Sequence, residues 1–449
     1  MSLLRVKSRR LAAAGGAAAL ALTVLAAAGG GAQAATSAFS VYPAPSTLQG
    51  VHDAGEPSVG VSWKTGKAMY QAGLRTYRID LANAGSAAGW SDVSSTLTST
   101  TSLDPILFTD KTTGRTFVSQ LSADCSLMAY TDNDGASWTQ NPVGCGLAAG
   151  ADHQTGGGGP YSSSGVGGTP VYPDSAYYCA QAVATAQCSV SRDGGVTWGA
   201  SVPIYTAASC GGLHGHIKVG PDGSAYVPNA DCGGQQAVVV STDNGATWTV
   251  RKVPGSKTQD ESDPSVAIGK GNSVYLGYAQ DTTAGKTSSS APYVAVSHDK
   301  GATWTNIKDV SGGTIKNVQF PTMVSGDDGR AALAFLGTST AGDDQAANFA
   351  GVWHLYVATT TDSGATWTLN DVTGADPVQR GCIWLGGGSN TCRNLLDFMD
   401  ASVTRDGKIV VGFADGCTGT CVNGGANPHD SYATIAVQNS GDLMYAVPQ

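Results

Sequence analysis

Short apolar or alternating runs recur along the chain, separated by clusters of Gly, Asp, Ser and Thr. One region shows the order clearly, with runs at 263–268, 273–278, 293–296 and 302–305. Runs of this length bounded by turn residues predict β-strands, whereas amphipathic helices need a longer apolar period of 3.6 residues. The pattern therefore predicts an all-β protein.

A turn sequence recurs between these runs. Residues 191–198, 241–248 and 297–304 follow the pattern SxDxGxTW, and looser copies occupy 131–138 and 360–367. The acidic or amide side chain can accept backbone N–H groups across a hairpin, the Gly can adopt positive φ, and the Trp can pack on the outgoing strand. These residues are therefore assigned a structural role, with direct carbohydrate contact as the alternative: Asn133, Asp193, Asp243, Asp299 and Asp362, with Trp138, Trp198, Trp248, Trp304 and Trp367.

The pattern SxDxGxTW resembles the Asp box of bacterial neuraminidase repeats (BNR repeats), which occurs in the sialidase superfamily and in other Asp-box β-propellers. Seven units of four strands can be traced around the five copies, and such units predict propeller blades that are buried by stacking on one another. The predicted fold is all-β, a seven-bladed propeller with four-stranded antiparallel blades in a single domain over 36–449; six blades is the alternative. We expect residues 38–42 and 443–447 to pair and close the ring.

Residues 1–35 are predicted to be a signal peptide, since a basic start precedes an Ala/Leu-rich run and the small-x-small sequence Ala32-Gln33-Ala34. Arg9-Arg10 leaves a twin-arginine signal open. Removing the four basic residues of this segment takes 25 basic residues to 21 against 34 acidic ones, a net charge of −13. This balance argues against nucleic acid or an anionic membrane as a partner. The mature protein is expected to be secreted, extracellular and monomeric, without membrane insertion.

Ten cysteines, an even number in an exported chain, predict disulfides. They fall in successive close pairs, and the predicted bridges are Cys125–Cys145, Cys179–Cys188, Cys210–Cys232, Cys382–Cys392 and Cys417–Cys421. Spacing alone does not fix this connectivity, and zinc at the last pair is the alternative.

The starts of the inner strands converge on the propeller axis and form the default ligand site. Acids stand at four of these starts, and they are the candidate catalytic residues: Glu56, Asp104, Asp263 and Asp400. Hydrolysis of a sugar bond needs one protonated carboxyl and one ionised carboxylate. The alternative is that these acids only cap loops. Glu56 and Asp400 are the first choices, because they come from the first and last blades.

Further candidates for substrate contact lie nearby: His153, His214, His216, Arg393 and Asp397. His214 and His216 are two residues apart, so they point to the same side of a strand. With His153 they could supply three nitrogens to a metal. The sequence requires no cofactor, and this metal site is an open alternative.

The resemblance implies a substrate-binding arginine triad, a Tyr–Glu nucleophile pair and an Asp acid/base. The nearest arginine motif, Tyr77-Arg78-Ile79-Asp80, lacks the expected Pro and falls on a third strand. No triad can be assembled, so strict sialidase activity is not predicted. The leading hypothesis is a secreted glycosyl hydrolase-like enzyme that acts on carbohydrate at the axial mouth. A non-catalytic carbohydrate- or protein-binding propeller and a metal-dependent enzyme using the mouth histidines are the alternatives.

Overall fold

The structure is a computed structural model that describes residues 36–122, 125–143, 152–164, 170–182, 184–258, 262–282 and 289–449. These residues form antiparallel sheets and only three short 3-10 helices: η1 (Leu81–Asn83), η2 (Ala87–Gly89) and η3 (Gly419–Asn423). No helix within the described ranges has the length and apolar character needed to span a bilayer.

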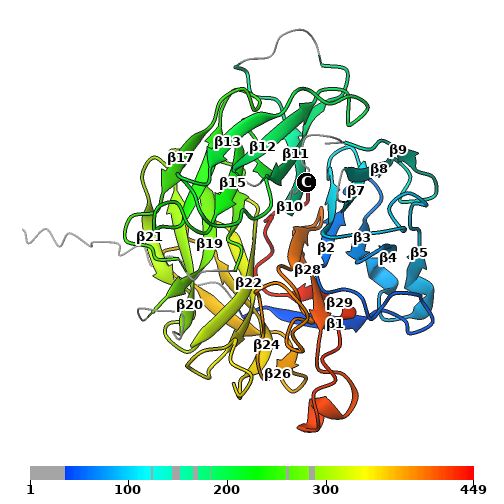
Figure 1. Cartoon of the computed structure of the whole chain (residues 1–449), viewed down its shortest axis with the longest axis vertical. Coiled ribbons are helices and arrows are strands. Elements are labelled where there is room, and N and C mark those ends of the chain that lie inside the picture. The colour runs from blue at the N-terminus through cyan, green and yellow to red at the C-terminus, as the bar shows by residue number, and fades with distance from the viewer. Residues whose placement is uncertain are drawn as a thin grey trace, which may run out of the picture. The chain divides into compact units, whose positions relative to one another are not determined.

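Seven sheets are arranged around an axis (Figure 1). Six are built on four consecutive strands, and the seventh combines the last three strands with the first strand of the chain, β1 (Ala38–Pro43). The first blade contains β2 (Ser58–Val61), β3 (Lys67–Ala72), β4 (Arg75–Asp80) and β5 (Trp90–Asp92). The second contains β6 (Pro105–Thr109), β7 (Thr116–Leu121), β8 (Ser126–Thr131) and β9 (Thr139–Gln140). The third contains β10 (Asp152–Pro160), β11 (Asp174–Gln181), β12 (Thr185–Ser191) and β13 (Val202–Thr206).

The fourth blade contains β14 (Lys218–Val219), β15 (Ala225–Asn229), β16 (Ala237–Ser241) and β17 (Thr249–Lys252). The fifth contains β18 (Ser265–Ile268), β19 (Val274–Asp281), β20 (Ser290–Ser297) and β21 (Thr305–Asp309). The sixth contains β22 (Asn317–Ser325), β23 (Ala331–Thr338), β24 (Val352–Thr360) and β25 (Thr368–Asp371), with β26 (Gln379–Arg380) paired to β24. The seventh contains β27 (Asp400–Val403), β28 (Ile409–Asp415), β29 (Tyr432–Ser440) and, as its outer strand, β1 (Ala38–Pro43).

The inner strands of neighbouring blades contact one another all the way round, including β2 with β27, so the ring is closed. The fold is therefore the predicted seven-bladed β-propeller, and the six-bladed alternative is wrong. Burial follows position in the blade: every residue of β23 is buried, whereas β21 alternates at the surface. Inner and second strands are apolar because blade stacking covers both of their faces.

Each SxDxGxTW turn joins the third strand of a blade to the fourth. In the copy at 241–248, Ser241 Oγ donates to Asp243 Oδ1 (2.9 Å), and Thr247 donates its N–H and its hydroxyl to the same carboxylate (2.9 and 2.6 Å). The corresponding Thr donors lower the pKa of Asp299 to about 2. The carboxylate therefore serves as the hydrogen-bonding centre of the turn.

Glycine in this turn meets two requirements at once. Gly245 has φ +81°, and a Cβ placed there would lie 2.7 Å from Val190 Cγ2 of the preceding blade. Positive φ and the close approach both exclude a side chain. The five Trp residues of these turns are each partly buried against an apolar cluster: Trp138, Trp198, Trp248, Trp304 and Trp367.

Strand β1 closes the ring by pairing with β29 in antiparallel register, with Val41 opposite Ala436. The prediction that residues 38–42 help to close the ring is thus confirmed. The predicted partner 443–447 is wrong, because the partner is β29. Gly441, at φ +96°, turns the chain out of the blade after β29. Met444 then bonds to Gly407 (2.7 Å) and Asp327 (2.9 Å), between the turns of the sixth and seventh blades.

The inner strand of the third blade is built around Gly156–Gly159, a run that hides the strand in the sequence. A Cβ at Gly157 would lie 2.5 Å from the Ile217 carbonyl, and one at Gly158 would lie 2.4 Å from the Ser175 carbonyl. The glycines therefore allow close approach of neighbouring strands in the crowded centre of the ring.

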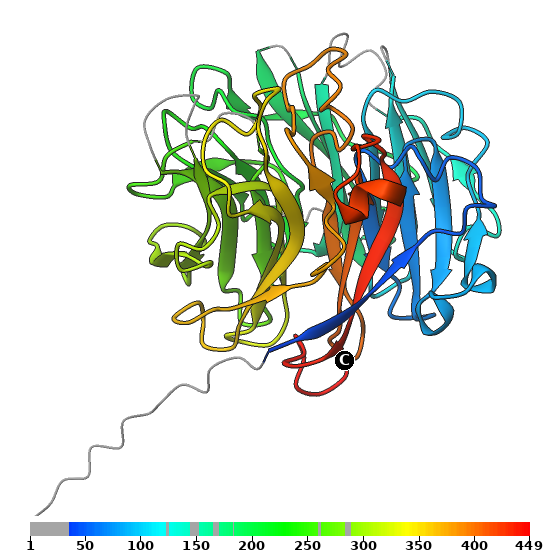
Figure 2. The same ribbon diagram turned by 90° about the horizontal axis from the view of Figure 1, so that it is seen from below.

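Four predicted disulfides are present: Cys179–Cys188, Cys210–Cys232, Cys382–Cys392 and Cys417–Cys421. Among the described residues no cysteine is free. Cys145, the predicted partner of Cys125, lies outside the described residues. Because the blades are antiparallel, these four bridges fall toward the face where the inner strands begin, and the SxDxGxTW turns fall on the opposite face. Figure 2 shows the two faces edge-on, with the C-terminus at the lower one.

Candidate functional site

The starts of the inner strands bring a group of titratable side chains together at one end of the axis. We call this group the mouth, and it consists of Glu56, Asp104, His153, His214, Asp263, Arg393 and Asp397. The side chains precede or begin β2, β6, β10, β14 and β18, or lie in the loop before β27. Residues separated by more than 300 positions in sequence thus act on one another electrostatically.

His153 and Asp263 form a buried ion pair across the mouth, with Nε2 and Oδ2 2.6 Å apart. Only 7% of each side chain is exposed. Burial alone would lower the pKa of His153, but the charge and hydrogen bond of Asp263, with smaller effects of Asp104 and Asp397, raise it well above its ordinary value. The imidazole is therefore a cation at neutral pH.

Glu56 contributes a buried carboxyl to the mouth. It is 5% exposed, and it has no hydrogen bond or ion pair among the described residues. Burial raises its pKa well above the ordinary value, and the negative charges of Asp104 and Asp397 raise it further. His153 and Arg393 act in the opposite direction without reversing the shift. The position thus favours the protonated form of the Glu56 carboxyl.

Two of the candidate acids accept backbone N–H groups across blade boundaries. Asp104 accepts from Gln154 N of the third blade (2.6 Å). Asp400 accepts from Val59 N of the first blade (3.3 Å) and from Ala401 N (2.9 Å). Burial raises the pKa of Asp400, which these bonds and Lys218 oppose. The loop-capping interpretation thus describes real contacts of Asp104 and Asp400, which join adjacent blades.

The two histidines before β14 are neutral. Burial lowers the pKa of His214 to about 3, helped by the charge of His153, whose ring centroid is 5.7 Å away. His214 Nδ1 donates to the Gly215 carbonyl (3.2 Å), so its Nε2 is an acceptor. That atom is buried and has no hydrogen-bond partner among the described residues. His216 packs against Phe398 with centroids 4.5 Å apart, and burial and Lys218 lower its pKa.

The mouth contains no three-nitrogen cluster. In the described part of the chain, no three His, Cys, Asp or Glu side chains are grouped closely enough to hold a metal ion. His153 uses Nε2 for Asp263, and His216 packs on Phe398. Metal binding by His153, His214 and His216 stays a hypothesis from the sequence, which metal analysis of the purified protein would test.

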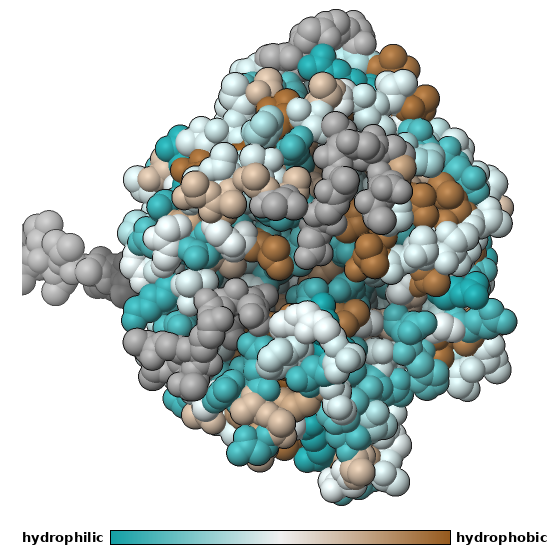
Figure 3. Space-filling model, viewed as in Figure 1, coloured by the Kyte–Doolittle hydropathy of each residue, from teal (hydrophilic) through white to brown (hydrophobic). Residues whose placement is uncertain are grey.

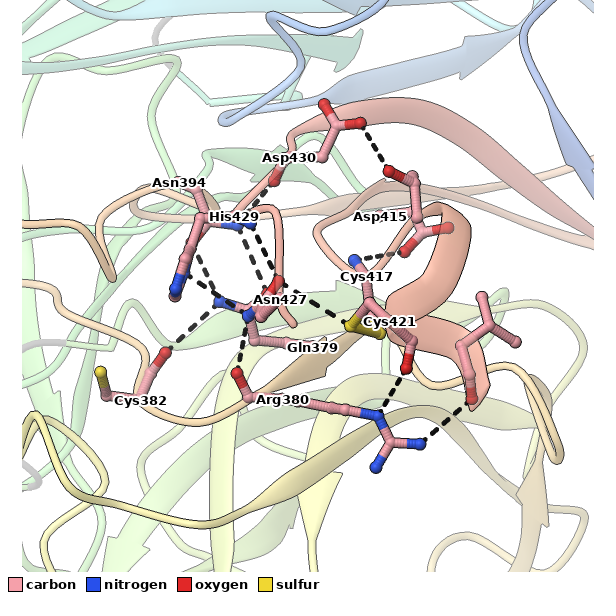
Figure 4. The surroundings of a disulfide bond; sticks show 12 residues. Gln379, Arg380, Cys382, Asn394, Asp415, Cys417, Cys421, Asn427, His429 and Asp430 are labelled. Atoms are coloured by element: carbon pink, nitrogen blue, oxygen red, sulfur yellow. Dashed lines mark hydrogen bonds between the residues drawn. A yellow bond between two sulfur atoms is a disulfide. The ribbon is translucent and has the colours of Figure 1, made fainter. Parts of the chain in front are cut away.

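The long loop between β25 and β27 supplies Arg393 and Asp397, which form an ion pair (2.8 Å). Figure 4 shows how neighbouring loops hold this segment. Gln379 donates to the side chain of Asn394 (2.9 Å), and Asn394 donates to the Asp430 carbonyl (2.6 Å). The mouth is therefore supported from the seventh blade as well as the sixth.

The segment that contains Glu56 also packs directly against the loop that contains Arg393 and Asp397. A Cβ at Gly55, the neighbour of Glu56, would lie 2.5 Å from Leu396 Cδ1. The absence of a side chain at this position lets the loop of Arg393 and Asp397 lie against the start of β2. The closeness of Glu56 to this loop thus depends on one glycine.

Lys218 is a site residue that the sequence analysis missed. Its Nζ lies 3.6 Å from Asp400 Oδ1, on the inner strand that follows the two histidines. A signal was present, since positions 214, 216 and 218 alternate as residues on one side of a strand do. Lys218 places a cation next to Asp400, which lies deeper along the axis than the mouth residues.

The surface around the mouth is mixed in polarity. Figure 3 shows small, separate hydrophobic areas among hydrophilic residues on the face seen in Figure 1. Single exposed apolar residues of this kind are normal for a protein surface. The titratable groups of the mouth, and not an apolar patch, thus distinguish this face.

Comparisons with known proteins identify the fold alone. No family model and no curated protein sequence matches the chain. The lectin BP39L from Burkholderia pseudomallei is similar at a TM-score of 0.50 and 14% identity over 81% of this chain and 93% of the lectin. A protein of unknown function from Dyadobacter fermentans gives a TM-score of 0.44 at 13% identity, covering 90% and 98% of the two chains. A sialidase from Trypanosoma rangeli gives 0.39 at 16%, and the match covers 74% of this chain and 54% of the sialidase.

Proposed function

We propose that the protein is a secreted glycoside hydrolase-like enzyme and that the mouth is its active site. The observation that supports this most directly is the state of Glu56, a buried carboxyl with a raised pKa and without a hydrogen bond among the described residues, close enough to Asp104 and Asp397 for their charges to act on it. A general acid for sugar-bond cleavage requires this combination. The SxDxGxTW turns, which resemble the Asp box of the sialidase superfamily, and the lectin and sialidase folds among the similar structures support carbohydrate as the ligand.

In this proposal Glu56 donates its proton to the glycosidic oxygen as the bond to the anomeric carbon breaks. Asp104, whose charge acts directly on Glu56, stabilises the positive charge that develops on the sugar ring. Water adds to the anomeric carbon, and the proton it releases restores the carboxyl. The cations His153 and Arg393, which pair with Asp263 and Asp397, orient polar groups of the sugar.

Asp400 is not paired with Glu56 in this scheme, although the sequence favours these two acids. Its carboxylate is bonded to backbone N–H groups and lies beside Lys218, whereas Asp104 and Asp397 are the acids whose charges act on Glu56. We therefore assign Asp400 a positioning role, which holds the first and seventh blades in register at the site.

The disulfides and the predicted signal peptide support secretion, because such bridges persist in oxidising compartments. The proposed place of action is outside the cell, on carbohydrate that reaches the open mouth.

The test is hydrolysis of a panel of nitrophenyl and methylumbelliferyl glycosides by the full chain and by Glu56→Gln. On a responsive substrate we expect the variant to lose about 10²–10⁴-fold in turnover while retaining the fold. In the parent, turnover should fall as pH rises through the pKa of Glu56, because the acid form is lost, and this limb should be absent from the variant. Asp344→Asn is the matched control: burial raises the pKa of this carboxyl to about 7, but it has no described contact with the mouth.

Full activity in Glu56→Gln would overturn the assignment of the acid. Saturable binding of glycosides without turnover of any of them would overturn catalysis and leave a carbohydrate-binding propeller.

A further inference from the structure

A cavity lies on the axis at the end opposite the mouth. The inner strands begin at the mouth and end at this cavity, which is lined by residues at or beyond the ends of β6, β14, β18, β22 and β27. We call it the rear cavity. Its volume is about 330 Å³, in the range of small-ligand sites and large enough for a sugar unit. None of the candidate residues taken from the sequence lines it.

The rear cavity combines an apolar wall with several charged groups. Trp63 and Tyr445 meet edge to face with centroids 5.5 Å apart, and Trp63 Nε1 donates to the Val403 carbonyl (2.8 Å). This bond fixes the indole, and the wall continues with Phe108 and Val219. Rigid aromatic and aliphatic walls of this kind pack against the apolar faces of small ring compounds.

Three lysines line the cavity: Lys111, Lys218 and Lys270. Lys270 Nζ donates to Gln449 Oε1 (2.9 Å) and lies 3.9 Å from Asp327 Oδ1, so the other two are considered as ligand-binding groups. Lys111 lies over the Trp63 ring at 4.6 Å, and its Nζ has no carboxylate within ion-pair distance among the described residues. Lys218 reaches the same cavity, and its nearest carboxylate, in Asp400, is 3.6 Å away. Burial lowers the pKa of Lys111; the charges of Asp110 and Asp174 oppose this shift, and the charge of Lys218 adds a smaller repulsion. An anion between Lys111 and Lys218 would relieve this repulsion.

An acidic pair stands at the side of the cavity. Asp110 is buried, and its carboxylate accepts N–H groups of Thr112 and Thr113 (3.0 and 3.1 Å) and the hydroxyl of Tyr172 (3.2 Å). Asp174, the first residue of β11, is only half-buried, and burial together with the charge of Asp110 raises its pKa to about 6. Both carboxylate oxygens of Asp110 thus accept hydrogen bonds within the protein. Asp174 offers a carboxyl oxygen to hydroxyl donors in the cavity.

We propose that the rear cavity is a second ligand site, which binds a small polyhydroxylated carboxylate of the uronic acid type. The carboxylate of the ligand lies between Lys111 and Lys218, its hydroxyls donate to Asp174, and its ring packs on the wall of Trp63. The site is separate from the mouth and does not depend on the proposed glycosidase activity.

The probe is sodium glucuronate, with glucose as the neutral analogue, titrated calorimetrically into the full chain. We expect saturable binding of glucuronate and at least tenfold weaker binding of glucose, because a hydrogen bond to a charged group is lost. Lys111→Met keeps the aliphatic stem over Trp63 and should weaken glucuronate at least tenfold. Lys64→Met is the matched control, since Lys64 is an exposed lysine of the neighbouring turn that does not line the cavity.

Two more variants keep the result decisive. Thr112→Trp adds bulk at an exposed position of the cavity lining and should also weaken glucuronate, without changing the backbone N–H that Asp110 accepts. Glu56→Gln should bind glucuronate as the parent does, whether or not the mouth is catalytic. Absence of saturable binding, equal binding of glucose, or binding that is lost in Glu56→Gln and kept in Lys111→Met would each overturn the proposal.

Discussion

Replacing Asp263 by Asn removes the negative charge from the buried pair with His153, and with it the charge that contributes most to raising the pKa of the imidazole. Removing one partner of such a pair usually costs about 3–5 kcal/mol of folding free energy, because an uncompensated charge remains buried. His153 can reduce this cost by losing its proton. Its neighbour His214 has a pKa lowered to about 3, mainly by burial, and shows the direction in which burial would move the pKa of His153.

This change makes the cost depend on pH in a defined direction. In the parent the folded-state pKa of His153 is raised, so the stabilisation is fully present below the unfolded pKa of about 6.5 and is lost as pH rises through the folded value. In Asp263→Asn the folded imidazole is neutral, whereas the unfolded one takes up a proton below about pH 6.5. The variant therefore loses about 2 kcal/mol between pH 7 and pH 5, at about 1.4 kcal/mol per pH unit.

The assay is urea unfolding of parent and variant at pH 5, 6 and 7 with the disulfides intact. The difference in unfolding free energy should be larger at pH 5 than at pH 7 by at least about 2 kcal/mol. Asp132→Asn is the control, because Asp132 pairs with Arg115 at the surface, where its carboxylate is 57% exposed. A difference that stays constant across this pH range would show that Asp263 does not maintain the charge of His153.

Three further outcomes are expected. Gly245→Ala should lower the unfolding free energy by about 2–4 kcal/mol, because the new Cβ combines positive φ with close contact to Val190. Gly255 has φ +75° but open space around it, so Gly255→Ala should cost only about 1 kcal/mol. Equal costs in the two variants would contradict the argument from close approach. Deletion of 36–43 removes β1, which pairs with β29, and should lower the unfolding midpoint. The unpaired edge of β29 should also promote aggregation, which light scattering would detect. An unchanged midpoint would mean that the seventh blade does not need its outer strand. Thiol titration of the unfolded, unreduced chain should read close to zero, and a substantial count would contradict full disulfide pairing.

The fold was predictable because its determinants are local and repeated. The five SxDxGxTW copies mark the same hairpin in five blades, and the apolar runs before them are the third strands. The β10 strand was obscured because Gly156–Gly159 carries no side-chain pattern, although the glycines are required there by the approach of Ile217 and Ser175. The closing partner 443–447 was wrong because one turn at Gly441 decides where the last segment goes.

The site was predictable only in part. The four acids, the three histidines and the Arg393–Asp397 pair stand at or near the starts of inner strands, and alignment of the repeats alone places such residues at one end of the axis. The repeat does not determine which of these residues contact one another. His153 bonds to Asp263, and Asp400 bonds to Val59, because of the directions of their side chains and the paths of their loops. The rear cavity was missed because its residues follow the inner strands, where no repeated residue type marks them.

The pairing of β1 with β29 joins positions 399 residues apart, as in the Ser40–Asn439 hydrogen bond. In an unstructured chain, bringing such distant segments together costs about 5 kcal/mol in loop-closure entropy, whereas stacked blades already hold them close. The segment made first during synthesis should therefore be among the last to dock, after the intervening blades have formed. Until then β29 keeps an open edge, so the newly made chain is most exposed to wrong partners just before the ring is complete.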